Sequence, residues 1–173
     1  MTLEKALQNS PAPPKILAAQ TLIDLEYLDF DGQIQIGYLV AHRELEPEIR
    51  QIFTEILVAR FPIFQMRPVC EFNWSDDVSM MQNNCSAFNY RRKLGKTALS
   101  FHATGRAIDI NPRQNPYIKA GLILPPGALY ETEKPGTMTE NSPVVAVFES
   151  RGWVWGGRWT KLLDYHHFQK PTA

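Results

Sequence analysis

The sequence predicts a single α+β domain in which a small antiparallel sheet is flanked by helices. Its 173 residues are enough for one domain. A hairpin pattern near the N-terminus is followed by an amphipathic helix, and later segments contain short strands and a second helix. Hydrophobic residues make up 44% and charged residues 21% of the chain, which is typical of a globular protein rather than a disordered one.

The composition also argues against several classes of protein. Lys plus Arg and Asp plus Glu each number 18, so the chain lacks the excess positive charge of a typical nucleic-acid binder. No apolar run approaches the roughly 20 residues that cross a bilayer. Prolines interrupt residues 1–20 where a secretory signal would be apolar. Cys70 and Cys85 are interpreted as two structural thiols, with a single disulfide as the alternative.

The strongest local signal is a hairpin that follows an N-terminal arm. We assign residues 1–20 to this arm and residues 21–173 to the folded domain. Period-two patterns predict strands over 22–30 and 33–41, with Asp31-Gly32 in the turn between them.

A helix is predicted from Glu44 to Arg60, because its apolar residues recur at spacings of three and four. Pro47 fits its first turn, and Phe61-Pro62 ends it.

The remaining elements are shorter. Asp76 and Asp77 are predicted to cap a helix that runs to about Asn84. A proline-rich loop over 112–140 either shapes a substrate groove or is a solvated insertion. The other expected elements are strands over 63–69 and 106–111, an extended segment over 86–91, a helix from Ser142-Pro143 to Gly152, and closing strands and turns over 153–159 and 165–168.

Residues able to bind a metal gather in two segments, 100–109 and 164–168, which hold three of the four histidines. A hydrolytic zinc site uses three His or carboxylate ligands and leaves one position open. His102, Asp109 and one of His166 or His167 would supply such a set. Neighbouring side chains alternate on an extended backbone, so only one of the two histidines should point inward, and spacing does not say which. The alternative is a group of polar residues satisfied on loops without a metal.

Several ordered motifs give a more specific indication. They are NCSAFNYR over 84–91, SxHxxGxAxD over 100–109, WGGxW over 155–159 and DxxHF over 164–168. Together they resemble the zinc peptidases that cleave peptidoglycan stem peptides, a family of D-alanyl-D-alanine carboxypeptidases and L-alanyl-D-glutamate endopeptidases. The resemblance covers roughly residues 35–170 and implies the hedgehog/DD-peptidase fold.

The resemblance implies a role for each matching residue. His102, Asp109 and His167 would bind one Zn²⁺ per chain. Asp164 would be the general base that activates water. Arg91 would stabilise the oxyanion that forms from the scissile carbonyl, and the adjacent Arg92 either competes for this role or is a solvated surface cation.

Other residues near these motifs receive weaker assignments. Ser100 would lie beside the metal and bind substrate, or it is a turn hydroxyl. Trp155 would form a wall of the cleft, or it is a core tryptophan. Gly105 should let the backbone turn between the first two ligands. His166 becomes a neighbour of the site, and His42 is interpreted as structural.

The implied reaction is zinc-assisted hydrolysis of an amide bond in a peptidoglycan or muropeptide substrate, by a monomer. A carboxypeptidase needs a cation for the terminal carboxylate of its substrate, and an endopeptidase needs an open groove. Candidates for that cation are Arg92, Arg106, Arg113 and Arg158, and the motifs do not choose between the activities. The alternative is a catalytically inactive, zinc-containing module that binds cell-wall peptides, which the presence of both Asp164 and Arg91 disfavours.

The substrate class leads us to expect a location in the cell envelope or outside the cell, although no signal peptide is visible. A phage lysin released through a membrane pore, or a cytoplasmic enzyme that recycles imported wall fragments, would reconcile these two observations.

Overall fold

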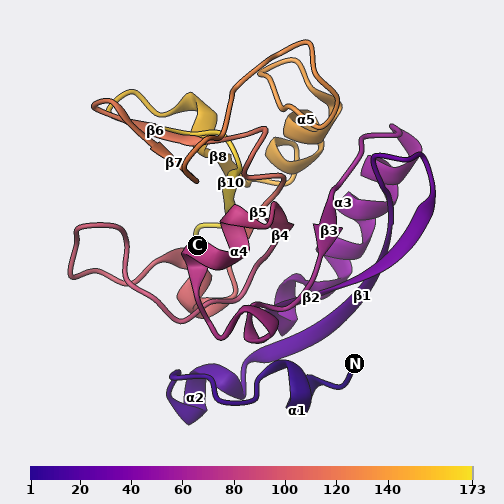
Figure 1. Ribbon diagram of the computed structural model, residues 1–173. Coiled ribbons are helices and arrows are strands. Elements are labelled where there is room, and N and C mark those ends of the chain that lie inside the picture. The colour runs from indigo at the N-terminus through magenta and orange to yellow at the C-terminus, as the bar shows by residue number, and fades with distance from the viewer. Residues whose placement is uncertain (173) are drawn as a thin grey trace.

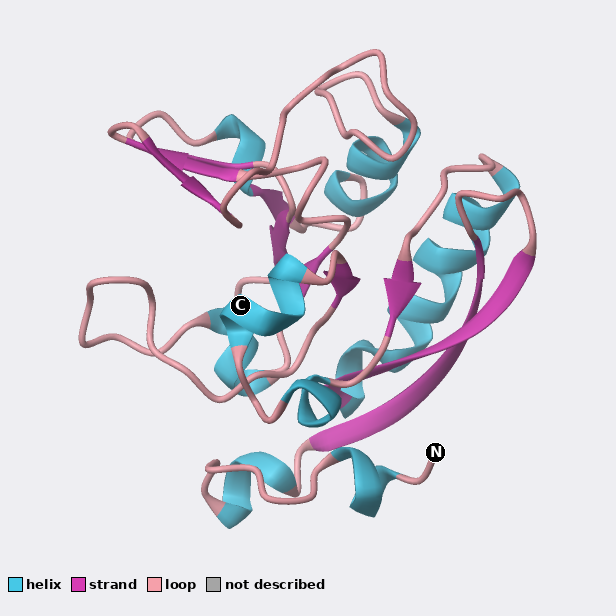
Figure 2. Ribbon diagram, viewed as in Figure 1, coloured by secondary structure: helices cyan, strands magenta, loops and turns pink. Residues whose placement is uncertain are grey.

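The computed structural model describes residues 1–172 and confirms the predicted α+β class (Figure 1). Small sheets lie between short helices, and long loops join them (Figure 2). The helices are α1 (Leu3–Ala6), α2 (Pro14–Leu17), α3 (Glu46–Val58), α4 (Asp76–Met81) and α5 (Pro143–Glu149). Across these described residues, none of the helices has the length and apolar character needed to span a membrane.

Strands β1 (Gln20–Leu28) and β2 (Ile34–His42) form the predicted hairpin. Both strands are displaced by one or two residues from their predicted bounds because Asp29 organises the turn. Its carboxylate accepts hydrogen bonds from the backbone N–H groups of Asp31 and Gln33. The chain therefore leaves the sheet at Asp29 and re-enters it at Ile34.

Helix α3 confirms the amphipathic pattern. Ile49, Ile52, Phe53 and Ile56 are buried on the side that packs against β1, and Val58 at the end of the helix is exposed. The long hairpin curves around this helix (Figure 1). Together they form one side of the main apolar core.

The centre of the domain is a three-stranded sheet with the order β5-β10-β8. These strands are β5 (Ala107–Asp109), β8 (Val154–Trp155) and β10 (His167–Gln169). Strand β10 is antiparallel to both neighbours, and His167 lies opposite Asp109. The sheet thus joins segments separated by nearly 60 residues of sequence.

Residues 112–140 do not form a featureless loop. They contain a hairpin of β6 (Tyr117–Lys119) and β7 (Leu122–Leu124), and β6 also pairs with β9 (Leu163–Asp164). Prolines around this hairpin hid its pattern in the sequence, and its strands are short and only partly buried. This pairing places the loop beside the segment that carries Asp164.

Two further predictions need correction. The strand expected over 63–69 is reduced to β3 (Gln65–Met66), which pairs in parallel with β4 (Asn84–Cys85). Helix α4 is capped by Ser75, whose hydroxyl accepts from the N–H of Val78, so Asp76 and Asp77 lie within the first turn. The capping residue lies immediately before the first helical residue, so the predicted cap at Asp76 or Asp77 was one or two positions too far along the chain.

The N-terminal arm is packed onto the domain. Ala6 and Ala12 are buried against Val40 and Phe88 in a second small apolar cluster. The indole of Trp74 also donates a hydrogen bond to the carbonyl of Gln8. The arm therefore covers the end of the β1-β2 hairpin (Figure 1).

Gly105 is expected to be the most sensitive glycine near the candidate site. Its φ is +69°, and an added Cβ would lie 2.5 Å from the backbone nitrogen of His42. Gly95 has nearly the same φ of +67° but open space around it, so it is a matched control. Gly95→Ala should cost about 1–2 kcal/mol of unfolding free energy, and Gly105→Ala at least about 1 kcal/mol more. Urea denaturation measures both, and equal losses would contradict the close packing at Gly105.

Candidate active site

Three buried side chains converge at one end of the β5-β10 pair. His102, Asp109 and His167 each direct one ligand atom into a group whose members lie within 4.8 Å of one another. The Nε2 atom of His102 is 3.0 Å from Asp109 Oδ2 and 3.2 Å from His167 Nδ1. His167 Nδ1 is 2.9 Å from Asp109 Oδ1. This set of two imidazoles and one carboxylate is one that zinc uses in hydrolytic sites.

Local structure explains why these side chains meet. Asp109 and His167 are opposite each other in the β5-β10 register, so their side chains emerge on the same face of the sheet. His102 lies in the short 3₁₀ helix Phe101–Thr104, which begins at Ser100 and ends at Gly105. The left-handed backbone of Gly105 then turns the chain directly into β5.

The outer nitrogens of both histidines have partners that fix the rings. His102 Nδ1 is 2.5 Å from the carbonyl oxygen of Ala87, so it must carry the proton of a neutral ring. His167 Nε2 is 3.3 Å from Gln169 Oε1, which favours protonation of that nitrogen. The two inner nitrogens then present lone pairs to each other and to the Asp109 carboxylate. Three acceptors facing one another are stabilised by a cation, so the group fits a divalent metal.

The charge at this site is concentrated on Asp109. Burial alone would raise the pKa of its carboxyl, but His102, His166 and His167 hold the pKa well below its usual range. For His167, burial favours the neutral ring, but without a metal Asp109 can accept a hydrogen bond from a proton on Nδ1, which raises the pKa above its usual value. The same carboxylate charge that attracts a proton would attract a metal cation.

His166 is also buried, contrary to the expectation that only one of the adjacent histidines points inward. Tyr165 and His166 form a turn between β9 and β10, so strand alternation does not apply to them. His166 Nδ1 is 2.7 Å from the carbonyl oxygen of Asn115, and Nε2 is 3.0 Å from Asp164 Oδ1. Burial would lower the pKa of His166, but Asp164 and Asp109 raise it to about 9. His166 therefore contacts Asp164 without joining the three-residue group.

Asp164 lies at the end of β9, where its side chain is 14% exposed and lines the cleft. Gly156 allows the backbone at Asp164 to pass close by, because glycine has no side chain. A Cβ on Gly156 would lie 2.5 Å from the backbone oxygen of Asp164 and 2.8 Å from its Cβ. The glycine in the WGG motif thus allows β9 to pass close to the turn after β8.

Arg91 and Ser100 are brought together by the loop between them. The N–H of Ser100 donates to the carbonyl of Arg91 at 3.0 Å, and both side chains line the cleft. Ser100 also caps the 3₁₀ helix, accepting from the N–H of His102 at 3.3 Å. Arg91 Nε is 2.8 Å from Asp76 Oδ1, which orients the guanidinium.

Trp155 is a core residue and does not line the cleft. It is 2% exposed, and its indole N–H donates to the carbonyl of Tyr165 at 2.8 Å. Trp159 occupies the wall instead, with its ring centroid 5.6 Å from that of His167. Of the two alternatives for Trp155, the structure places it in the core.

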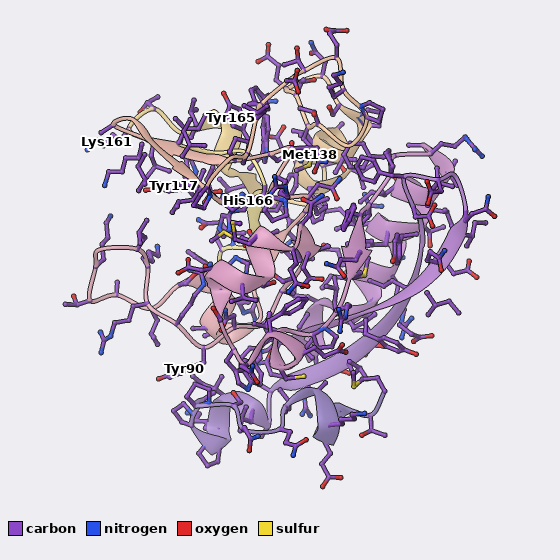
Figure 3. The ribbon with its side chains drawn as sticks, viewed as in Figure 1. Tyr90, Tyr117, Met138, Lys161, Tyr165 and His166 are labelled. Atoms are coloured by element: carbon purple, nitrogen blue, oxygen red, sulfur yellow. The ribbon has the colours of Figure 1, made fainter. Side chains whose placement is uncertain are left out.

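These groups lie in a cleft of about 610 Å³. Figure 3 shows His166 at its inner end, with Tyr117 and Lys161 further out on the β6-β9 side. Of the four arginines considered for a substrate carboxylate, only Arg158 is among the residues that line it. Arg158 is already paired with Glu149 at 2.6 Å and with Glu140 at 3.7 Å.

Neither cysteine takes part in this site. Cys70 and Cys85 are both free thiols. Cys85 is fully buried, and burial together with the nearby Asp109 raises the pKa of its thiol well above the usual value. The interpretation as structural thiols agrees with this arrangement.

A comparison with protein families supports the motif resemblance. Residues 94–170 match a family model described as D-alanyl-D-alanine carboxypeptidase. Over these residues the chain is therefore similar to the family that the motifs indicated. No significant match was found among curated proteins or among solved structures. The matched segment contains all three candidate ligands and Asp164, whereas Asp76 and Arg91 precede it.

The sequence analysis gave no role in the site to three residues that the structure places there. Gln169 contacts His167, Trp159 forms a wall, and Asp76 pairs with Arg91. Gln169 could have been found from its alternation with His167 along a strand, which puts both side chains on one face. No local pattern connects Asp76 with Arg91, because their contact depends on how α4 packs.

Replacing His167 should abolish stable metal binding. We expect His167→Ala to lower zinc affinity by more than the roughly 10- to 100-fold that follows loss of an outer partner of a ligand. His42→Ala is the control, because His42 lies outside the three-residue group and its Nδ1 accepts from the backbone of Glu44. Elemental analysis after dialysis measures zinc per chain. Stoichiometric zinc in His167→Ala would contradict the assignment.

Proposed function

We propose that the chain is a zinc-dependent peptidase that hydrolyses an amide bond in peptidoglycan stem peptides. The observation that carries this proposal is the buried His-Asp-His group at an open cleft, within the segment that matches the family model. Zinc, when bound by His102, Asp109 and His167, would supply a Lewis acid that polarises a carbonyl and makes water more acidic.

Asp164 is the proposed general base. Its carboxylate lines the cleft beside the ligand group, and it is held by the contact with His166. There it can take a proton from the attacking water and deliver it to the nitrogen of the leaving amine. Because His166 also donates to the carbonyl of Asn115, its ring is fixed and can orient Asp164.

Arg91 is the proposed oxyanion-stabilising residue. A guanidinium that is already oriented can interact with negative charge as it develops on the carbonyl oxygen, without reorganising during the reaction. The ion pair with Asp76 supplies this orientation and leaves the remaining guanidinium nitrogens for the substrate.

The first test uses defined muropeptides and mass spectrometry. We expect cleavage that a zinc chelator abolishes and that added zinc restores. Loss of the terminal D-Ala would make the protein a carboxypeptidase, and cleavage between L-Ala and D-Glu would make it an endopeptidase. Asp164→Asn should retain zinc and lose at least about 100-fold in turnover, because only the proton acceptor is removed.

Two outcomes would contradict this proposal. Undiminished cleavage by Asp164→Asn would exclude Asp164 as the base. A zinc-loaded protein that cleaves no stem peptide would favour the binding-module alternative.

The role of Arg91 can be tested through its partner. Asp76→Asn should lower kcat by about 10- to 100-fold with a smaller change in KM, because a misplaced guanidinium loses contact chiefly in the transition state. Asp77→Asn is the matched control, since Asp77 occupies the same first turn of α4 but has no ion pair with Arg91. Steady-state kinetics on the cleaved muropeptide measures both. Equal effects of the two substitutions would contradict a positioning role for Asp76.

A further inference from the structure

We propose that the outer part of the cleft binds substrate carboxylates that are not part of the scissile amide, through Lys93, Lys96, Lys119 and Lys161. This inference rests on the proposed function and specifies its substrate class as acidic peptides. All four side chains line the same cleft as Asp164 and His167.

The lysines come from two segments on opposite sides of the cleft, which we call the first and the second cleft arm. Lys93 and Lys96 lie on the loop between Arg91 and Ser100, which projects from the domain (Figure 1). Lys119 ends strand β6, and Lys161 lies just before β9, so both belong to the second cleft arm. A substrate that enters the cleft would pass between positive charges on both sides.

The four ammonium groups are available for a ligand. No ion pair to any of them occurs within residues 1–172, whereas the cleft arginines Arg91 and Arg158 are both paired with carboxylates. Lys93 lies over the ring of Phe101, with its Nζ 5.1 Å from the centroid, and the other three are exposed. Three carboxylates also line the cleft: Asp76 is paired with Arg91, Asp164 contacts His166, and Asp77 is exposed.

This local charge is not a consequence of composition. The chain as a whole has a formal net charge of zero, yet half of its lysines line this one cleft. Cations gathered around a cleft attract and orient anionic ligands, and salt screens the effect over about 8 Å at physiological ionic strength.

The surroundings favour a peptide over a phosphate polymer. Leu94, Leu124 and Leu162 line the cleft alongside the lysines, so apolar and cationic contacts alternate on both arms. An extended acidic peptide presents the same mixture of apolar and anionic groups. A flexible ammonium also tolerates carboxylates at varied positions, unlike the fixed fork of an arginine.

The test compares two stem peptides that differ in one group. One carries the free α-carboxylate of D-Glu, and the other carries an amide at that position. Calorimetry measures their binding to the Asp164→Asn protein, which should not consume them. In that background, K93Q/K96Q and K119Q/K161Q each remove two charges from one arm, and K5Q/K15Q removes two exposed charges from the N-terminal arm as a control.

We expect each cleft pair to weaken binding of the acidic peptide by about tenfold at low salt and to leave the amidated peptide within about twofold. The difference should shrink as salt is added. The control should bind both peptides like the parent. Because all six substitutions are at the surface or partly exposed, thermal unfolding should remain that of the parent.

Several results would overturn the inference. Equal losses for the acidic and amidated peptides would do so, as would an equal effect of K5Q/K15Q. Lysine-dependent binding of a polyphosphate chain without lysine-dependent binding of the acidic peptide would show that the anion is a phosphate.

The cleavage assay separates this inference from the proposed function. If the unsubstituted protein cleaves acidic and amidated peptides with the same KM, the inference fails while the peptidase assignment stands. If it cleaves neither peptide but binds the acidic one through the lysines, the peptidase assignment fails and the inference stands.

Discussion

The pairing of β10 with β5 is the constraint on which the candidate site depends. It sets His167 opposite Asp109, two residues that are 58 positions apart in the sequence. A shift of this register by one residue would send one of the two side chains to the other face of the sheet. Strand β10 also pairs with β8, and Phe168 between these neighbours is completely buried in the core. The apolar core therefore fixes the register that brings the two ligands together.

Around this pair, each of the two histidines has an outer partner that leaves its inner nitrogen free. Ala87 fixes the ring of His102, and Gln169 contacts the outer nitrogen of His167. Both contacts direct a lone pair towards Asp109, whose charge is maintained despite burial. The result is a group arranged to hold a cation, in which the outer nitrogens of both histidines already have partners. The cleft then extends from this rigid floor to two arms that belong to loops and short strands.

Elements with strong local periodicity could be predicted from the sequence. The β1-β2 hairpin and α3 were predicted correctly to within a few residues, because their patterns reflect burial of one face over many residues. The β6-β7 hairpin was missed, since three-residue strands beside prolines carry almost no periodic signal. His166 lies in a turn and His167 in a strand, so both side chains can be buried. Two adjacent histidines in a sequence do not show whether a turn or a strand contains them.

The residue types available for metal binding and hydrolysis could be recognised from the sequence, because motif spacing and chemistry are local properties of the chain. Their assembly was decided by the tertiary structure. Three features of the site join residues from different elements. They are the contact of Asp76 with Arg91, the position of Trp159 rather than Trp155 in the cleft wall, and the four lysines around one cleft. Such contacts depend on how helices and strands pack, and packing is set by the whole core rather than by any one segment.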